Sequence, residues 1–324
     1  MSHTEPSRPK RLAIVVPCYN ESEVLPLSVP RLLAVCKKVR DTLALEPCVL
    51  FVDDGSADQT WDIIEREAQA SPYVRGLKLA HNVGHQHALW AGMEWAVAHA
   101  DVAVTIDADL QDDEHVILQM VRHYLDGADI VYGVREQRIG DGFFKRTTAQ
   151  AYYRFMRAYG IDLVYNHADF RLLSNRALKA LTAYSERNLF LRGMVRQLGL
   201  PSAVVTYNQN PRKAGTTKYP PRKMLSLAID GLTSFSVRPI HLTFYAGIIC
   251  MLIAVVTIIM AFVKHLMGHT ITGWTSLIMS LWFIGGLVLM SLGIIGEYVG
   301  KIYIEVKQRP RYLIEKEVGD ASEQ

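Results

Sequence analysis

Short apolar runs alternate with longer amphipathic stretches in the first half of the chain. Each run is five or six residues long, and most are rich in valine and isoleucine, as is typical of buried strands. The stretches between most of the runs carry apolar residues at helical spacing. Strands that alternate with helices predict an α/β domain with a mostly parallel sheet. The runs are 12–16, 48–52, 74–79, 102–106 and 130–134, and the helical stretches are 24–40, 60–70, 86–99 and 114–125.

The pattern changes near Pro239, after which two long apolar stretches follow. Residues 242–263 contain no charged side chain, and residues 274–299 contain only Glu297. About 20 apolar residues are needed for a helix to cross a bilayer, so both stretches are long enough. Two buried helices of a soluble protein are the alternative, but uninterrupted runs of this length are typical of membrane spans.

The connector between the two apolar stretches is short, which predicts a helical hairpin with both flanks on one side of the membrane. Basic residues are concentrated in these flanks, whereas the connector 264–273 holds only Lys264. Because basic residues favour the cytoplasmic side, we expect a multi-pass protein of the inner (cytoplasmic) membrane with its large domain in the cytoplasm. The basic flank residues are Arg222, Lys223, Arg238, Lys301, Lys307, Arg309 and Arg311.

These features divide the chain into four parts. A globular domain over 1–215 precedes an amphipathic region over 216–240, two transmembrane helices over 241–300 and a cytoplasmic tail over 301–324. The periodicity of the amphipathic region fits a helix in the membrane interface and a helix packed on the globular domain equally well.

The composition narrows the class of protein. Hydrophobic residues make up 50% of the chain and charged residues 21%, a balance that permits a folded core. The formal net charge of +3 gives no reason to expect nucleic acid as a partner. The four cysteines include no C-x-x-C pair, so we expect reduced thiols rather than a disulfide framework or a zinc site.

An acidic triplet, Asp107-Ala108-Asp109, directly follows the apolar run 102–106. Two carboxylates one residue apart at the end of a strand can share a divalent cation, and their hard oxygen ligands suit Mg²⁺ or Mn²⁺. Such an ion neutralises the charge that develops on a departing nucleoside diphosphate. Because isolated triplets of this kind also occur on solvated turns, the neighbouring residues decide between the two interpretations.

Polar turns also follow the other predicted strands. Residues 17–21 follow the first strand, residues 53–56 the second and residues 82–84 the third. The carboxyl ends of parallel strands meet at one edge of a sheet, where acidic and amide side chains can hold the base and ribose of a nucleotide. Plain turns, with Ser56 as a helix cap, are the alternative. Several polar turns at one edge favour a nucleotide site.

Together the motifs resemble those of family 2 inverting glycosyltransferases with the GT-A fold. More narrowly they resemble the polyprenyl-phosphate glycosyltransferases, which include bactoprenol glucosyltransferases and dolichol-phosphate mannose synthases. The resemblance covers nearly the whole chain and implies a Rossmann-like GT-A catalytic domain with a C-terminal transmembrane hairpin. The motifs that carry it are 17–21, 53–56, 107–111, 167–171, 215–219, 296–300 and 309–312, and the stretches 186–190 and 231–236 are most similar to bactoprenol glucosyltransferases.

The resemblance implies a role for each matching residue. It places Asp107 and Asp109 on the metal ion and the diphosphate, and Asp169 at the position often assigned as the catalytic base. Solvated surface charge is the alternative for the two basic residues at 145 and 146. The residues implied to bind the nucleotide sugar are Pro17, Tyr19, Glu21, Asp54, Gln111, Arg212 and Lys218, and those implied to bind the lipid phosphate are Arg135, Lys145 and Arg146.

The reaction that the resemblance implies is a single displacement of the nucleoside diphosphate by a lipid phosphate oxygen. The second pKa of a phosphate is about 6, so this acceptor needs a general base less than a hydroxyl does. We therefore expect Asp169 to position the substrates, with a role as base as the second option. A plain ion pair between Asp169 and Arg171 is the alternative to both.

The expected partners are a nucleotide sugar, a polyprenyl phosphate, the membrane and further copies of the chain. Glucose from UDP-glucose and undecaprenyl phosphate are the first choices, while galactose, mannose, N-acetylhexosamine and a modified arabinose stay open because pocket shape decides the sugar. A processive polysaccharide synthase is disfavoured, since the chain lacks Gln-x-x-Arg-Trp. The intact acidic triplet disfavours an inactive scaffold or transport subunit, and the absence of Gly-x-Gly-x-x-Gly after the first strand disfavours a dehydrogenase.

Overall fold

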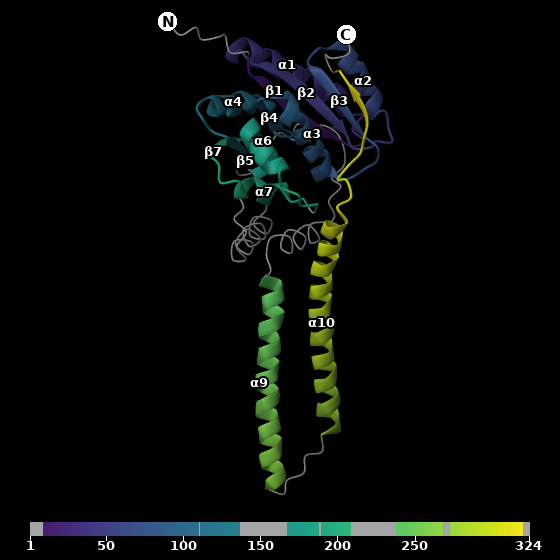
Figure 1. The fold of residues 1–324 in the computed structure, drawn as a ribbon, viewed down its shortest axis with the longest axis vertical. Coiled ribbons are helices and arrows are strands. Elements are labelled where there is room, and N and C mark those ends of the chain that lie inside the picture. Colours follow the sequence, from purple (N-terminus) through teal and green to yellow (C-terminus); the bar gives the residue numbers. More distant parts are fainter. Residues whose placement is uncertain are drawn as a thin grey trace. The chain divides into compact units, whose positions relative to one another are not determined.

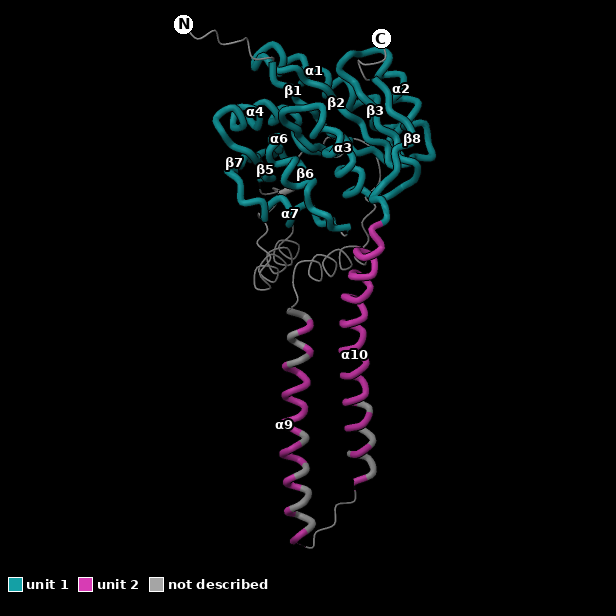
Figure 2. The backbone as a smooth tube through the Cα atoms, in the orientation of Figure 1, with its two compact units in different colours: residues 1–155, 162–219, 309–324 teal, residues 156–161, 220–308 magenta. Residues whose placement is uncertain are grey.

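The structure is a computed structural model that describes residues 9–109, 111–136, 167–187, 189–208, 238–267 and 273–319. It contains two compact units, shown in different colours in Figure 2. Unit 1 comprises Met1–Phe155, Asp162–Tyr219 and Arg309–Gln324, and unit 2 comprises Met156–Ile161 and Pro220–Gln308. The end of the chain therefore belongs to the same unit as its beginning.

Unit 1 is built on an eight-stranded mixed sheet (Figure 1). Its strand order is β7-β5-β6-β4-β1-β2-β3-β8. The neighbours β4-β1, β1-β2, β2-β3 and β5-β7 are parallel, while β6 runs antiparallel to both β4 and β5, and β8 runs antiparallel to β3. The strands are β1 (Arg11–Cys18), β2 (Glu46–Asp53), β3 (Val74–Leu79), β4 (Val102–Thr105), β5 (Ile130–Arg135), β6 (His167–Ser174), β7 (Ser202–Tyr207) and β8 (Ile314–Val318).

Helices cover both faces of this sheet, as the sequence predicts for an α/β domain. One face carries α1, α2 and α4, and the other carries α3 and α6. A short 3₁₀ turn (Glu114–Val116) precedes α4. The helices of unit 1 are α1 (Leu25–Leu43), α2 (Thr60–Ala70), α3 (His85–His99), α4 (Ile117–Leu125), α6 (Asn175–Thr182) and α7 (Leu191–Gln197).

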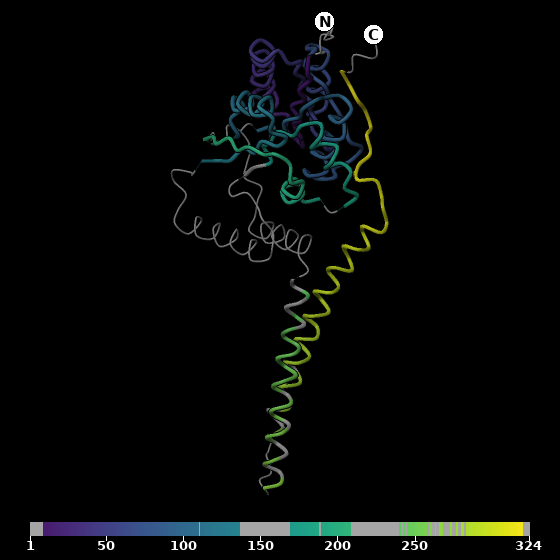
Figure 3. The backbone as a smooth tube through the Cα atoms, turned by 60° about the vertical axis from the view of Figure 1, so that its left-hand side comes forward, coloured from purple at the N-terminus to yellow at the C-terminus, as the bar shows by residue number. Residues whose placement is uncertain are grey.

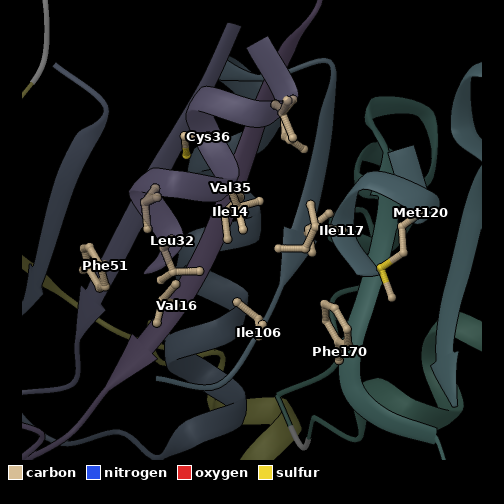
Figure 4. Packing of buried hydrophobic residues seen from close by; sticks show 14 of the residues in the cluster. Ile14, Val16, Leu32, Val35, Cys36, Phe51, Ile106, Ile117, Met120 and Phe170 are labelled. Carbon is tan, nitrogen blue, oxygen red and sulfur yellow. The ribbon is translucent and has the colours of Figure 1, made fainter. Parts of the chain in front are cut away.

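The alternation of side chains along the central strand β1 explains why both faces are covered. Ile14 and Val16 are fully buried and point toward Leu32 of α1 (Figure 4). Val15, between these two residues, is buried on the opposite face. Helix α3 approaches that face so closely that a Cβ added at Gly92 would lie 2.3 Å from the Cγ1 atom of Val15. A strand with apolar residues on both faces needs a helix on each, which accounts for the continuous apolar run at this position.

The five predicted strands and four predicted helices are confirmed, with small shifts of their ends. The strands β6, β7 and β8 and the helices α6 and α7 were not predicted, because none of them has a long apolar run. The sequence of β8, IEKEV, is typical of an edge strand, on which charged residues discourage pairing with other chains.

Strand β8 makes part of the predicted cytoplasmic tail a structural element of unit 1. It pairs with β3 in the register Gly76↔Val318 to Leu79↔Ile314. An ion pair joins Lys78 Nζ to Glu315 Oε1 at 3.0 Å, and Tyr312, just before the strand, donates a hydrogen bond to Glu94 of α3. The end of the chain is thereby fixed to the edge of the sheet.

Unit 2 contains two long antiparallel helices, α9 (Arg238–Leu266) and α10 (Trp274–Lys307), which lie side by side in both Figure 1 and Figure 3. Among the described residues, one helical segment is long and apolar enough to cross a membrane: Phe283–Lys307, with a mean hydropathy of 1.7 and no part buried in the protein. A shorter apolar segment, Tyr245–Thr257, lies in α9. One candidate segment thus meets the length and composition of a membrane span among the described residues, and the predicted two-helix hairpin stays a prediction.

Candidate active site

The turns after β1 and β2 are joined by hydrogen bonds at the carboxyl edge of the sheet. The backbone N–H of Asn20 donates to Ser56 Oγ at 2.9 Å, and Asn20 Oδ1 accepts from the N–H of Ala57 at 2.9 Å. Asn20 has a φ of 54°, a left-handed conformation that asparagine tolerates better than most residues. The two polar turns predicted from the sequence therefore form one structure.

Asp54 connects this structure to the start of α3. Its carboxylate accepts hydrogen bonds from the backbone N–H groups of Val83, at 2.7 Å, and Gly84, at 2.9 Å. Burial raises the pKa of Asp54, although these two donors lower it in part. The turn requires a glycine at position 55, where φ is +64° and a Cβ would lie 2.6 Å from the carbonyl carbon of His81. Each carboxylate oxygen keeps a further lone pair, which can accept a hydrogen bond from a nucleobase. That contact of Asp54 stays a prediction.

The antiparallel strand β6 brings Asp169 to the acidic triplet. In the β4–β6 pairing Thr105 lies opposite Arg171, and the Thr105 hydroxyl donates to the carbonyl oxygen of Asp169 at 2.5 Å. Asp107 lies two residues beyond Thr105 and Asp169 two residues before Arg171, so the direction of the two strands brings both carboxylates to the same edge. The structure thus places together two carboxylates that are 62 residues apart and that the sequence links only through family resemblance.

His85 lies between these two carboxylates. Its Nε2 atom is 3.6 Å from Asp107 Oδ1 and 3.7 Å from Asp169 Oδ2. Burial lowers the pKa of His85, but the contact with Asp169 and the charge of Asp107 outweigh this effect and raise it. The sequence analysis did not select His85; its position directly after the polar turn 82–84 was the available signal.

The surroundings of Asp107 do not favour its negative charge. Removal from water raises its pKa, His85 lowers it, and the neighbouring charges of Asp169, Asp112 and Asp109 raise it further, with a net increase. A divalent cation at this position would reverse that balance. The chemistry of the site therefore fits the predicted metal ion.

The residues present fit a metal ion that also binds substrate. In the part of the chain that the structure describes, no three histidine, cysteine, aspartate or glutamate residues are grouped to hold a metal by themselves. Magnesium and manganese sites commonly use one or two carboxylates and take their other ligands from substrate phosphates and water. Asp107 and Asp109, with oxygen ligands only, match that pattern.

Asp169 is held as a carboxylate by two arginines. Arg171 donates to its Oδ1, while Arg192 of α7 lies 3.3 Å from Oδ1 through Nε and 3.2 Å from Oδ2 through Nη2. Burial alone would raise the pKa of Asp169, but Arg192, His85 and Arg171 together hold it well below its usual range. The ion pair with Arg171, which the sequence offers as the alternative to a role in the reaction, is present. A carboxyl group with so low a pKa is a weak general base.

Arg135 is placed by Asp112, three residues beyond Asp109. Its Nε and Nη2 lie 3.0 and 2.9 Å from Asp112 Oδ1, which also accepts from the Tyr207 hydroxyl at 2.6 Å. Asp112 is buried, whereas 29% of the Arg135 side chain is exposed. The cluster fixes the loop that carries Asp109, and a contact of Arg135 with a lipid phosphate stays a prediction.

The other predicted residues fall into two groups. Among those described, Pro17 is buried in β1, whereas Tyr19 is 43% exposed. The N–H of Glu21 donates to Thr60 Oγ1 at 2.8 Å. The N–H of Gln111 donates to Asp109 Oδ1 at 3.2 Å. Arg212, Lys218, Lys145 and Arg146 lie outside the described residues.

The mixed α/β sheet with charged groups at its carboxyl edge, together with the family match below, shows the class of the protein: it is a glycosyltransferase with a GT-A, Rossmann-like domain. The model of the glycosyl transferase family 2 matches residues 13–182, slightly more than half of the chain. The chain belongs to glycosyl transferase family 2.

Relatives extend the likeness over almost the whole chain. The uncharacterized glycosyltransferase YkoT of Bacillus subtilis is 51% identical over 94% of this chain and 91% of its own length. The SfII prophage-derived bactoprenol glucosyl transferase of Shigella flexneri is 36% identical over 94% of this chain and 98% of its own length. A glucosyl-3-phosphoglycerate synthase structure from Mycobacterium tuberculosis is similar with a TM-score of 0.46 and 19% identity, over 69% of this chain and 79% of that one.

Proposed function

We propose that the protein transfers a hexose from a nucleotide sugar to a polyprenyl phosphate at the cytoplasmic face of a membrane. UDP-glucose and undecaprenyl phosphate are the first choices, because bactoprenol glucosyl transferases match almost the full length of the chain. The observation that carries the proposal is the arrangement at the carboxyl edge, where His85 lies within 3.7 Å of both Asp107 and Asp169. His85 thus lies between Asp107, on the proposed diphosphate side of the site, and Asp169, the carboxylate that pairs with two arginines.

The path of the chain supports a two-helix membrane hairpin. Unit 1 includes the chain up to Tyr219 and again from Arg309, and a folded domain lies on one side of a membrane. The chain between these points must therefore cross the membrane an even number of times or not at all. If Phe283–Lys307 crosses it, a second crossing is required. The 29 residues of α9 reach about 43 Å at about 1.5 Å per residue, longer than the roughly 30 Å of a hydrocarbon core.

The chemistry required of the protein is mainly electrostatic. A phosphate oxygen of the lipid forms a bond to the anomeric carbon, and the bond to the nucleoside diphosphate breaks with its electron pair on the leaving oxygen. No proton needs to move, because the acceptor is largely a dianion above its second pKa of about 6. Asp107 and Asp109 would hold Mg²⁺ or Mn²⁺, which when bound neutralises the charge on the leaving diphosphate.

The arginines beside Asp169 support a role in positioning the substrates over a role as proton acceptor. Arg171 is buried and acts on Asp169 from inside the domain, while Arg192 keeps 38% of its side chain exposed. A fixed carboxylate keeps the Arg192 guanidinium in place, and a guanidinium binds phosphate oxygens well. The pair thus offers an ordered cation to an anionic acceptor.

A transfer assay tests the proposal. The full-length protein in lipid vesicles is incubated with undecaprenyl phosphate, Mg²⁺ or Mn²⁺ and, in turn, UDP-glucose, UDP-galactose, UDP-N-acetylglucosamine and GDP-mannose. We expect one sugar to appear on the lipid as a single monophosphate-linked residue with inverted anomeric configuration. A polymer would instead identify a processive synthase, and the absence of any transfer from all donors would refute the proposal in favour of an inactive scaffold.

A further inference from the structure

Arg311, the second arginine after the end of α10, is enclosed by residues of unit 1. Its guanidinium donates to the carbonyl oxygens of Tyr184, at 2.5 Å, and Glu186, at 2.9 and 3.1 Å. The same group lies 4.2 Å from the ring centre of Trp90 and 3.6 Å from a carboxylate oxygen of Glu94. Only 10% of its side chain is exposed. An arginine with this number of partners, two of them on α3, acts as a fixed connection rather than as a surface charge.

The segment that Arg311 holds leads directly to the candidate active site. Beyond Glu186, the carbonyl oxygen of Arg187 lies 3.3 Å from His87 Nε2. At the start of α7, the N–H of Leu191 donates to Gln86 Oε1 at 3.2 Å, and its carbonyl oxygen accepts from Arg171 at 3.2 Å. The next residue, Arg192, is the one that pairs with Asp169. The chain is thus held by other parts of unit 1 both at 184–187 and at Leu191, directly before Arg192.

Two ion pairs of the tail join it to other parts of unit 1. Lys316 pairs with Glu65 of α2 at 2.6 Å, and Lys78 of β3 pairs with Glu315. Both pairs join partly exposed side chains and add little to stability. Of the tail cations whose contacts the structure describes, Arg311 is the one bonded to the 184–187 segment.

We infer that Arg311 is a positioning residue for the transfer reaction. Through the carbonyl groups of Tyr184 and Glu186 it fixes the segment that places Arg192 against Asp169. Three residues separate it from Lys307 at the end of α10, so this contact is made by the chain directly after that helix. The kinetic part of this inference rests on the proposed transfer to a lipid phosphate; the structural part does not.

The test compares Arg311→Ala with Lys316→Ala in full-length protein in lipid vesicles. Both variants remove one tail cation that pairs with a glutamate of unit 1, but only the first removes contacts with the 184–187 segment. Hydrogen–deuterium exchange of peptides covering 184–195 should increase in Arg311→Ala and stay at the wild-type level in Lys316→Ala. Unchanged exchange in Arg311→Ala would overturn the inference. Arg311→Lys, which cannot reproduce the forked contacts, should give an intermediate increase and serves if the alanine variant does not fold.

The kinetic measurement separates positioning from general damage to the fold. Since a displacement of about 1 Å can cost on the order of 100-fold in rate, we expect Arg311→Ala to lower kcat by roughly 10- to 100-fold. The KM for the nucleotide sugar should change by no more than about twofold, because a misplaced Arg192 weakens an interaction with the acceptor phosphate rather than with the nucleotide sugar.

A double-mutant cycle with Arg192→Ala shows whether Arg311 acts through Arg192. In the Arg192→Ala background, adding Arg311→Ala should lower kcat by no more than about twofold, since coupled residues are not additive. Full additivity, or an equal loss in Lys316→Ala, would refute the positioning role. If the wild-type protein transfers no sugar while exchange at 184–195 still increases in Arg311→Ala, the structural connection stands and the proposed function fails instead.

Discussion

Replacement of Asp169 by asparagine should destabilise unit 1 strongly. The variant keeps the size of the side chain but leaves the guanidinium of Arg171, 2% exposed, without its negative partner. Removing one partner of a buried ion pair costs about 3–5 kcal/mol, because the remaining charge stays buried. The pair with Arg192, which is 38% exposed, should add about 1 kcal/mol or less. We therefore expect a total loss of about 3–6 kcal/mol in the free energy of unfolding.

Thermal unfolding of the full-length protein measures this effect. At about 2–4 °C per kcal/mol for a domain of this size, the midpoint for unit 1 should fall by roughly 6–24 °C. Arg176→Ala is the matched control, since it breaks a pair with Asp129 whose arginine is 70% exposed and should cost about 1 kcal/mol or less. The double variant Asp169→Asn with Arg171→Met should recover much of the loss, because it no longer buries an unpaired charge. A midpoint for Asp169→Asn within the range of the control would refute this account.

The same ion pairs predict how stability depends on pH. The folded state lowers the pKa of Asp169, so its contribution is complete above the unfolded-state pKa of about 3.9 and is lost as the pH falls through the folded-state value. Wild-type protein should therefore lose stability below about pH 4 more steeply than Asp169→Asn. Equal slopes for the two proteins would contradict the lowered pKa.

Three further substitutions test other parts of the site. Asp107→Ala should abolish transfer, as measured in the lipid assay, while the protein stays folded in the membrane; full activity with added Mg²⁺ or Mn²⁺ would exclude the metal role. Gly55→Ala, which forces a Cβ against the backbone of His81, should lower the midpoint of thermal unfolding and raise the KM for the nucleotide sugar; wild-type values for both would contradict the described turn. Tyr207→Phe removes the hydrogen bond to the buried carboxylate of Asp112 and should cost about 1–3 kcal/mol in unfolding free energy, whereas no change would indicate that the cluster is not formed.

The sequence predicts the central sheet well because burial there produces a direct signal. Strand β1 is covered on both faces, so Leu12 to Val16 are all fully buried and form a continuous apolar run. The polar turns then had to lie at the carboxyl edge, as the hydrogen bonds of Asn20 with Ser56 and Ala57 show. The charged edge strand β8 gives no such signal, because its exposed side chains are selected to avoid further pairing.

The composition of the site was harder to predict because it depends on contacts between distant segments. The acidic triplet and the Asp54 turn follow apolar runs and were found directly, but the approach of Asp169 depends on the antiparallel register of β6 against β4. Arg192 reaches Asp169 from α7, a seven-residue helix with no strong periodicity. No local pattern in the sequence encodes either pairing, so family resemblance supplied Asp169 and nothing supplied Arg192.

The distribution of charge gives a physical reason for a metal ion in the proposed reaction. Asp169 is balanced by Arg171 and Arg192, and its pKa is lowered, whereas the pKa of Asp107 is raised despite the nearby His85. The protein therefore compensates the negative charge of Asp169 more fully than that of Asp107. At an effective dielectric constant of 20, two like unit charges about 4 Å apart repel each other by about 4 kcal/mol, and a diphosphate beside Asp107 would meet that repulsion. A divalent cation held by Asp107 and Asp109 would turn this repulsion into attraction, so we expect the donor to bind tightly only together with the metal.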